Sequence, residues 1–159
     1  MNVISNKQLS QTTLENFFTT HWGSPEMVIS SGTYDCSKLE GFAKLNNENE
    51  IIGLITFIIK KNSCEIISLD SLEEGKGIGT SLLKQVEQFA RGRKCYVIKL
   101  VTTNDNLHAL KFYQKRGYQL VTIHKNAVVK AREIKPQIPL IGNDGIPIRD
   151  EIELEKKLD

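Results

Sequence analysis

A β-hairpin that leads through a glycine loop into a helix is indicated near the middle of the chain. Residues 51–59 are apolar almost throughout, as is typical of a strand covered on both faces, and residues 60–63 (KKNS) supply a turn. Residues 64–69 would form the antiparallel partner strand. Next come the segment LEEGKGIGT, with its alternating glycines, and an apolar stripe at helical spacing. This order predicts a mixed α/β fold and disfavours a dinucleotide-binding βαβ unit, which needs parallel strands.

Shorter patterns extend the prediction along the rest of the chain. The helix at 106–115 would take Asn104 or Asp105 as its N-cap and end at Gly117. No internal repeat or linker interrupts the sequence. We therefore expect one α/β (α+β) domain over residues 1–159, with a mixed, mostly antiparallel twisted sheet flanked by helices. Further helices are expected at 9–20 and 127–134, strands at 27–30, 41–45, 96–101, 118–123 and 152–158, and turns at 31–38.

The composition excludes several classes of protein. A formal charge of +2, from 21 Lys and Arg against 19 Asp and Glu, lacks the basic excess of a dedicated nucleic-acid binder. The longest apolar run, residues 51–59, is too short to cross a bilayer, and the N-terminus lacks the pattern of a signal peptide. Cys36, Cys64 and Cys95 have no metal-ligand spacing. We expect reduced thiols, no metal site, a cytoplasmic location, and neither nucleic acid nor membrane as a partner.

The glycine loop could hold a phosphate group. Gly75, Gly77 and Gly79 permit a sharp turn and leave backbone N–H groups at a helix N-terminus, which together can cradle a pyrophosphate. The segment GKGIG matches neither the G-x-G-x-x-G dinucleotide fingerprint nor a P-loop. A purely structural glycine turn is the alternative that the loop alone leaves open.

A second motif follows after the distance that one helix and one strand require. It reads N-x-x-A-x-x-F-Y-x-x-x-G-Y from Asn106 to Tyr118. Together with Glu74 to Gly79, it resembles the GNAT superfamily of N-acetyltransferases, whose motifs are Q/R-x-x-G-x-G/A and N-x-x-A-x-x-F/L-Y-x-x-x-G-F/Y. The resemblance implies a GNAT-like domain with its motif core at about residues 40–123. Glu74 departs from the family's Gln or Arg, and we expect its side chain to face solvent.

The resemblance also implies an activity. The chain would be an acetyl-CoA-dependent N-acetyltransferase, with acetyl-CoA as the co-substrate, no metal, and direct attack on the thioester by a primary amine of a small molecule or protein. A non-catalytic acyl-CoA-binding or sensing module on the same fold is the alternative. Residues 124–159 form a C-terminal extension to which no family role transfers, and a homodimer is compatible with the sequence. Nothing in the sequence names the acceptor.

The same resemblance assigns residues to the co-substrate. The strand before the loop and Asn106 would contact the pantetheine arm, and the backbone amides of the loop would bind the pyrophosphate. The residues implied to contact acetyl-CoA are Ile67, Ser68, Leu69, Glu74, Gly75, Lys76, Gly77, Ile78, Gly79, Thr80, Asn106 and Tyr113.

Acetyl transfer to an amine also needs a base and an acid. An amine with a pKa near 10.4 is almost fully protonated at pH 7, and deprotonating it costs about 4.6 kcal/mol. Glu65 and Asp70 are candidate bases on the strand before the loop, where simple alternation places them on opposite faces unless a bulge intervenes. We favour Glu65, with Asp70 or a bound water open and an exposed edge-strand acid as the structural alternative. Tyr113 stands at the position of the family's general acid and would protonate the leaving thiolate, and its alternative is a packed aromatic residue.

Overall fold

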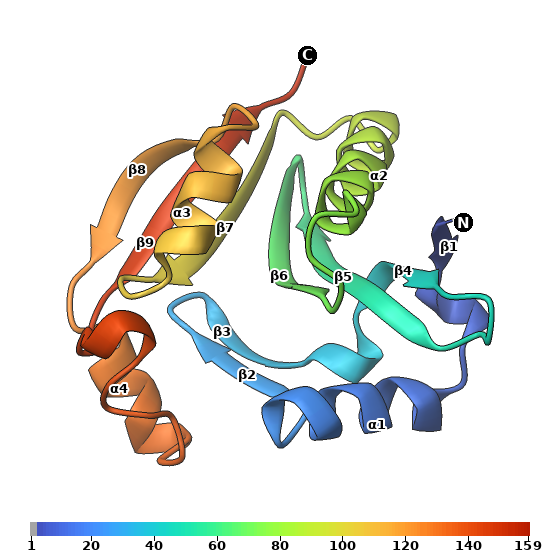
Figure 1. Ribbon diagram of the computed structural model, residues 1–159. Coiled ribbons are helices and arrows are strands. Elements are labelled where there is room, and N and C mark those ends of the chain that lie inside the picture. Colours follow the sequence, from blue (N-terminus) through green and yellow to red (C-terminus); the bar gives the residue numbers. More distant parts are fainter. Residues whose placement is uncertain (1–2) are drawn as a thin grey trace. The chain divides into compact units, whose positions relative to one another are not determined.

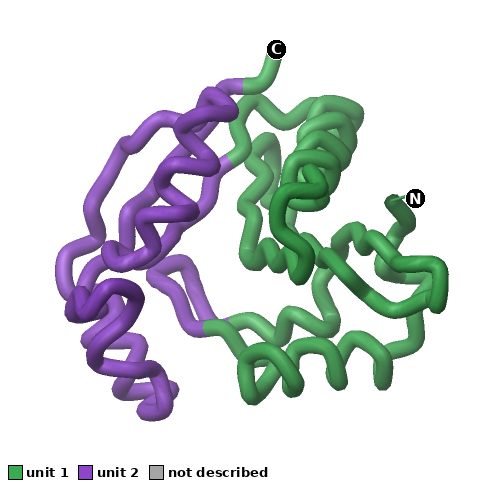
Figure 2. The backbone as a smooth tube through the Cα atoms, in the orientation of Figure 1, with its two compact units in different colours: residues 1–27, 34–98, 158–159 green, residues 28–33, 99–157 purple. Residues whose placement is uncertain are grey.

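The computed structural model describes residues 3–159 and divides into two compact units (Figures 1 and 2). Unit 1 comprises residues 1–27, 34–98 and 158–159, and unit 2 comprises residues 28–33 and 99–157. The helices and strands, in chain order, are β1 (Val3–Ser5), α1 (Gln11–Trp22), β2 (Glu26–Ile29), β3 (Gly32–Asp35), β4 (Glu40–Leu45), β5 (Ile51–Lys60), β6 (Ser63–Ser71), α2 (Ile78–Gly92), β7 (Val97–Thr103), α3 (Leu107–Gln114), β8 (Gln119–His124), α4 (Ala127–Ile134) and β9 (Glu151–Lys157).

Unit 1 contains the predicted hairpin and the helix that follows the glycine loop. Its strands lie in the order β1-β4-β5-β6, with antiparallel pairing at each step. Helix α2 packs against β5 at Gly53, where a Cβ atom would lie 2.4 Å from the Cγ2 atom of Ile78. Ile78, Leu82 and Val86 of α2 are buried in the core of the unit. The absence of a side chain at Gly53 thus lets the start of α2 approach the sheet closely.

A β-bulge changes the faces of β6. The register between β5 and β6 shifts once, leaving Ile67 as the extra residue of β6. Residues directly opposite each other in an antiparallel pair lie on the same face. Glu65 opposes Ile58 and Asp70 opposes Leu54, so both acids share one face. The bulge that the sequence left open is therefore present, and the opposite faces expected from simple alternation do not occur.

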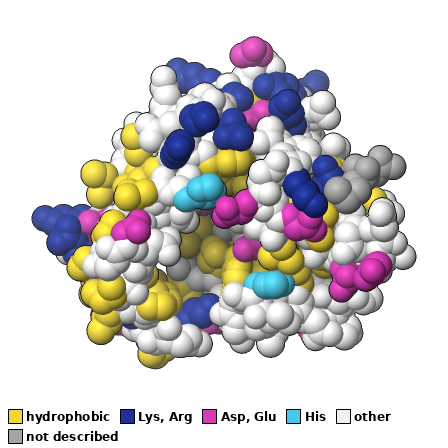
Figure 3. All heavy atoms as spheres, viewed as in Figure 1, with side chains coloured by type: hydrophobic (Ala, Val, Ile, Leu, Met, Phe, Trp, Pro, Cys, Tyr) yellow, Lys and Arg dark blue, Asp and Glu magenta, His cyan; other side chains and the backbone are white. Residues whose placement is uncertain are grey.

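Unit 2 contains α3, α4, β8, β9 and the part of β7 from Lys99 onward, and these strands lie in the order β7-β9-β8. Strands β8 and β9 pair antiparallel, from Gln119 opposite Glu155 to His124 opposite Glu151. Hydrophobic side chains gather on the surface over β8 and α4 (Figure 3). Ile123, for example, is 66% exposed.

The predicted closing strand at residues 152–158 is found as β9, and the predicted helix at 127–134 is found as α4.

The predicted mixed α/β class with mostly antiparallel strands is confirmed, and so are most of the individual elements. Two strands escaped prediction: β1, and β3, which lies within the stretch 31–38 that was expected to be turns. Strand β3 pairs with β2 in a separate two-stranded sheet, a partnership that local composition does not indicate. No helix within residues 3–159 is long and apolar enough to span a membrane. The single domain over residues 1–159 stays a prediction.

The three cysteines are buried free thiols, as expected. Burial raises the pKa of both Cys36 and Cys64 to about 12. Burial also raises the pKa of the Cys95 thiol. Because the thiolate is the reactive form, these side chains act as small buried hydrophobic groups at neutral pH.

Candidate active site

The turn between β6 and α2 has the backbone that the glycine loop predicts. Gly75 and Gly77 adopt left-handed conformations, with φ of 77° and 69°. A Cβ atom at either position would meet no atom of the described residues within 4 Å. Both glycines are thus required by the backbone conformation and not by close packing, and the space beside them is open.

Helix α2 begins without a side-chain cap. Gly77 is its N-cap residue, and no side chain hydrogen-bonds to the first turn from this position. Ser81 N donates to Gly77 O at 3.0 Å, which closes the first helical hydrogen bond. The N–H groups of a first helical turn lie at the positive end of the helix dipole. The open turn and this helix end therefore suit a phosphate or pyrophosphate group.

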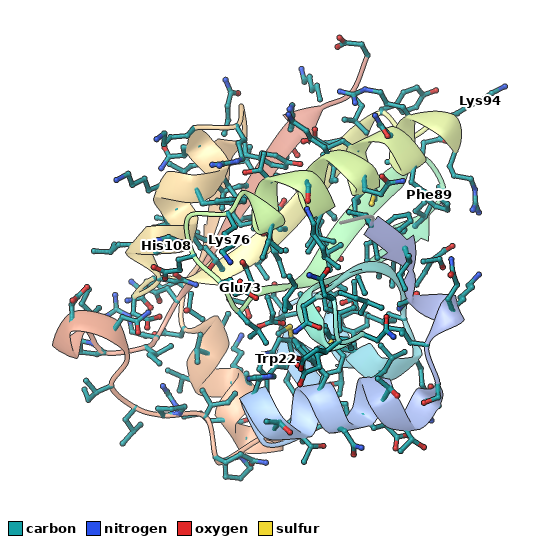
Figure 4. The ribbon with its side chains drawn as sticks, turned by 45° about the vertical axis from the view of Figure 1, so that its right-hand side comes forward. Trp22, Glu73, Lys76, Phe89, Lys94 and His108 are labelled. Atoms are coloured by element: carbon teal, nitrogen blue, oxygen red, sulfur yellow. The ribbon has the colours of Figure 1, made fainter. Side chains whose placement is uncertain are left out.

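The side chains of the loop carry both signs of charge. Lys76 Nζ lies 2.7 Å from Glu73 Oε1, and Figure 4 shows both side chains on the loop. Glu74 is exposed, as expected from its departure from the family motif. Lys76 is therefore paired with Glu73 in the loop, while Glu74, at the position of the family's Gln or Arg, faces solvent.

Asp70 near the end of β6 is a half-buried residue whose carboxyl group has one buried, unsatisfied oxygen. Its Oδ1 accepts a hydrogen bond of 3.0 Å from Nε1 of Trp22. Trp22 is the last residue of α1 (Figure 4). The Oδ2 atom of Asp70 is buried and has no hydrogen-bond partner among the described residues. Burial raises the pKa of this carboxyl, against smaller lowering effects of the Trp22 hydrogen bond and of His21. A partly buried carboxyl with a raised pKa and an oxygen that accepts no hydrogen bond is suited to take up a proton.

The same face of β6 continues with polar groups towards Glu65. The hydroxyls of Ser68 and Thr56 hydrogen-bond across the strand pair, and both also interact with the Cys36 thiol. Glu65 is 7% exposed, so the alternative of an exposed edge-strand acid is wrong. With the bulge, about four residue steps, roughly 13 Å along the strand, separate Glu65 from Asp70.

Helix α3 begins in the opposite way to α2. The Oδ1 atom of Asn106 accepts from Ala109 N at 3.1 Å and caps the helix. The prediction of Asn104 or Asp105 as the N-cap is wrong, because the C-terminal extension occupies both side chains. Asn104 Oδ1 accepts from the backbone N–H groups of Arg149 and Asp150, at 2.9 and 3.0 Å.

The extension also satisfies the carboxylate of Asp105. This residue is 5% exposed, and its two oxygens accept from the Thr103 hydroxyl and from Asn143 N. A Cβ atom at Gly142 would lie 2.0 Å from Asp105 Oδ2, so only glycine permits this approach. Residues 124–159 therefore hold the turn before α3, a role that the sequence did not reveal.

Tyr113 is packed among aromatic rings on α3. It is 6% exposed, and its ring centroid lies 5.1 Å from that of Phe112 and 5.4 Å from that of Tyr118. The packing fixes the ring orientation. The general-acid role of its hydroxyl stays a prediction.

The candidate residues fall in both units. Asn106 and Tyr113 lie in unit 2, at the start and near the end of α3. The candidates in unit 1, on β6, in the turn and in the first turn of α2, are Glu65, Ile67, Ser68, Leu69, Glu74, Gly75, Lys76, Gly77, Ile78, Gly79 and Thr80.

Comparison with known proteins gives one family and several relatives. The family described as "Acetyltransferase (GNAT) family" matches residues 9–118. The chain is 55% identical over 158 residues to "Uncharacterized protein YxbD" of Bacillus subtilis (strain 168), covering 99% of both chains. It is 28% identical over 127 residues to "Probable spermine N(1)-acetyltransferase" of Bacillus subtilis subsp. natto (strain BEST195), covering 74% of both.

Solved structures share the fold. An "IAA acetyltransferase" from Bacillus cereus ATCC 14579 superposes with a TM-score of 0.72 at 21% identity, over 99% of this chain and 100% of that one. A GNAT family acetyltransferase from Elizabethkingia anophelis, solved with acetyl-CoA bound, has a TM-score of 0.64 at 29% identity, over 77% and 78% of the two chains. The predicted resemblance is thus confirmed by both sequence and structure.

Proposed function

Because this chain belongs to the GNAT acetyltransferase family, we propose that it transfers the acetyl group of acetyl-CoA to a primary amine of a small molecule or protein. The observation that carries the proposal is the turn before α2, with two left-handed glycines, open space beside both and an uncapped helix end. The acetyl-CoA bound to the Elizabethkingia relative supports this co-substrate. The distant relative named as a spermine acetyltransferase supports an amine acceptor.

In this proposal the backbone of the α2 start binds the pyrophosphate. The N–H groups from Gly75 to Thr80 would donate to its oxygens, and the helix dipole would favour its negative charge. Ile67, Ser68 and Leu69 around the bulge, together with Asn106, would contact the pantetheine arm. Acetyl-CoA supplies the acetyl group as a thioester, and the remaining chemistry falls to side chains.

A carboxyl on β6 would take the proton from the attacking amine. Glu65 and Asp70 share a face, so both are candidates, with a bound water as the third. We place Asp70 first, because its raised pKa and unsatisfied Oδ2 suit proton uptake. Nitrogen then bonds to the acetyl carbon, the carbon–sulfur bond breaks, and the Tyr113 hydroxyl would give the sulfur a proton. The nitrogen then loses a second proton, which would restore the Tyr113 hydroxyl, and the carboxyl would release its proton to solvent. The products are the N-acetylated amine, coenzyme A and one proton.

Two linked measurements test the function. Acetyl-CoA at about 100 times its Kd should stabilise the protein by about 2.7 kcal/mol, a rise in Tm of several degrees. A panel of polyamines, amino acids and lysine peptides should then include an amine that releases free thiol from acetyl-CoA. A clear shift without thiol release from any amine would favour the acyl-CoA-binding module, and a shift with NAD or ATP but not with coenzyme A would overturn the proposal.

A further inference from the structure

A pocket of about 430 Å³ lies within unit 2, and none of the described residues that line it is a candidate active-site residue. One side is formed by the end of β2 and the residue after it, with Val28, Ile29 and Ser30. The other side is formed by the end of β8 and by α4. At about 30 Å³ for each water-sized unit, the pocket has room for a ligand of roughly fourteen non-hydrogen atoms.

The β2 side of the pocket is held in place by a buried carboxylate. Both oxygens of Glu151, which is 2% exposed, accept from Ser30 N at 3.1 and 3.2 Å. This anchors the turn after β2 to β9. The carboxylate points at the backbone N–H of the turn and does not line the pocket.

The α4 side is anchored as firmly. Asp150 Oδ1 accepts from Asn126 N at 2.8 Å, and Val128 N donates to Arg149 O at 2.9 Å. The Arg132 guanidinium donates to backbone carbonyls, including that of Ile148. Both walls are therefore fixed to the same segment of the extension, as expected of a pocket formed before its ligand arrives.

The lining combines an apolar surface with positive charge. Ala127, Ala131 and Ile134 of α4 face the pocket together with the β2 residues, and Ile134 is 60% exposed. Lys125 and Lys130 also line it, while no aspartate or glutamate does. Figure 3 shows hydrophobic side chains gathered over α4. The lining thus favours a ligand with a compact apolar body and a negative charge.

The nearby carboxylates are already engaged. Glu153 pairs with His124 at 2.8 Å, and Asp150 pairs with Arg149 at 3.0 Å. The positive charge of Lys125 also contributes to lowering the pKa of Asp150. Lys130 has no ion pair with any residue that the structure describes. Its ammonium is therefore the group at this pocket best placed to bind an anion from solution.

We propose that this pocket binds a small organic carboxylate, with the carboxylate at Lys130 and an apolar body of about ten non-hydrogen atoms against Val28, Ala131 and Ile134. The ligand could be an acetyl acceptor that carries both an amine and a carboxylate, or an effector that is never acetylated. Binding to the pocket needs no acetyl-CoA, so its test stands apart from the test of the transferase.

The test is calorimetric titration of the whole protein with 4-phenylbutyrate and with its uncharged match, 4-phenylbutanamide. The carboxylate should bind at least tenfold more tightly than the amide. Lys130→Gln should remove this preference, while Lys157→Gln, at an exposed lysine away from the pocket, should leave it unchanged. Ala127→Leu should weaken both ligands by filling the pocket. Equal affinity for the two ligands, or a preference that survives Lys130→Gln, would overturn the proposal.

A second arm separates the two sources of the carboxylate. The probe is 2-amino-4-phenylbutyrate, offered together with acetyl-CoA. Acetylation with a KM raised by Lys130→Gln identifies the pocket as an acceptor subsite. Binding that depends on Lys130 without acetylation identifies an effector site, and absence of any binding counts against the pocket whatever the transferase does.

Discussion

The two turns that carry the family motifs handle their polar groups in opposite ways. Before α2, Asp70 keeps a buried oxygen unsatisfied and Gly77 leaves the helix end uncapped. Before α3, both oxygens of Asp105 accept hydrogen bonds and the Asn106 side chain caps the helix. Unsatisfied buried groups cost stability and persist where a ligand or a reaction uses them. We therefore propose that the β6–α2 turn binds the phosphate groups, whereas the turn before α3 is already stabilised by the protein's own hydrogen bonds.

The largest effect is expected at Asp70. Asp70→Asn can still accept from Trp22 but cannot take a proton, so kcat should fall by about 10²- to 10⁴-fold. The measurement is thiol release with an active amine. Glu65→Gln should cost less, and a greater loss in Glu65→Gln than in Asp70→Asn would return the role of base to Glu65.

The pH dependence of the free energy of unfolding should also differ between variants of Asp70 and Asp105. Because the pKa of Asp70 is raised in the fold, its stabilising effect is complete below the unfolded value of about 3.9 and is lost as the pH rises through the folded pKa. Asp70→Asn should therefore be more stable than the wild type at pH 7 in urea unfolding, and the difference should vanish below about pH 4. Asp105→Asn can place an amide NH₂ group opposite Asn143 N, which then loses its hydrogen-bond acceptor. This variant should therefore be less stable than the wild type at pH 7.

The next largest effect is expected at Gly77. Gly77→Asp puts a carboxylate into the open space of the cradle, and acetyl-CoA affinity measured by calorimetry should fall at least about 100-fold. Gly23→Asp is the matched control, because Gly23 is also left-handed, with φ of 86°, and has nothing near its Cβ position. If both variants lose affinity equally, backbone strain and not the cradle explains the loss.

A smaller effect on turnover is expected at Tyr113. Tyr113→Phe keeps the ring packing, so folding and acetyl-CoA binding should persist. The turnover number should fall about 100-fold, at the lower end for general-acid catalysis, since a thiolate with a pKa near 8.5 can leave without help. A wild-type rate from pH 6 to 9 would show that Tyr113 only packs.

The smallest effect is expected at the cap of α3. Asn106→Ala removes the acceptor for Ala109 N and should cost about 1 kcal/mol, a fall in Tm of roughly 2–4 °C. Asn106→Asp keeps an acceptor there and should retain the stability. A loss of acetyl-CoA affinity in both variants would support the proposed pantetheine contact of the amide nitrogen.

Local patterns predicted the elements but not the long-range contacts between them. The hairpin, α2 and α4 follow from periodicity and turn residues, which act over a few positions. The bulge at Ile67 depends on pairing with β5, and the hydrogen bond from Trp22 to Asp70 joins residues 48 positions apart. The contacts of Asn104 with the extension span 45 and 46 positions. No local signal distinguishes these side chains from others at helix ends, in strands or in turns.

The direct test of the contrast between the two turns is the response of backbone amides to coenzyme A, followed by NMR chemical shifts and hydrogen exchange. The amides of Gly77, Ile78 and Gly79 should show the largest shifts and the greatest slowing of exchange on binding. The Ala109 amide, already bonded to Asn106, should change much less. If the changes instead concentrate at Ala109 and the start of α2 stays unaffected, the β6–α2 turn is not the phosphate cradle.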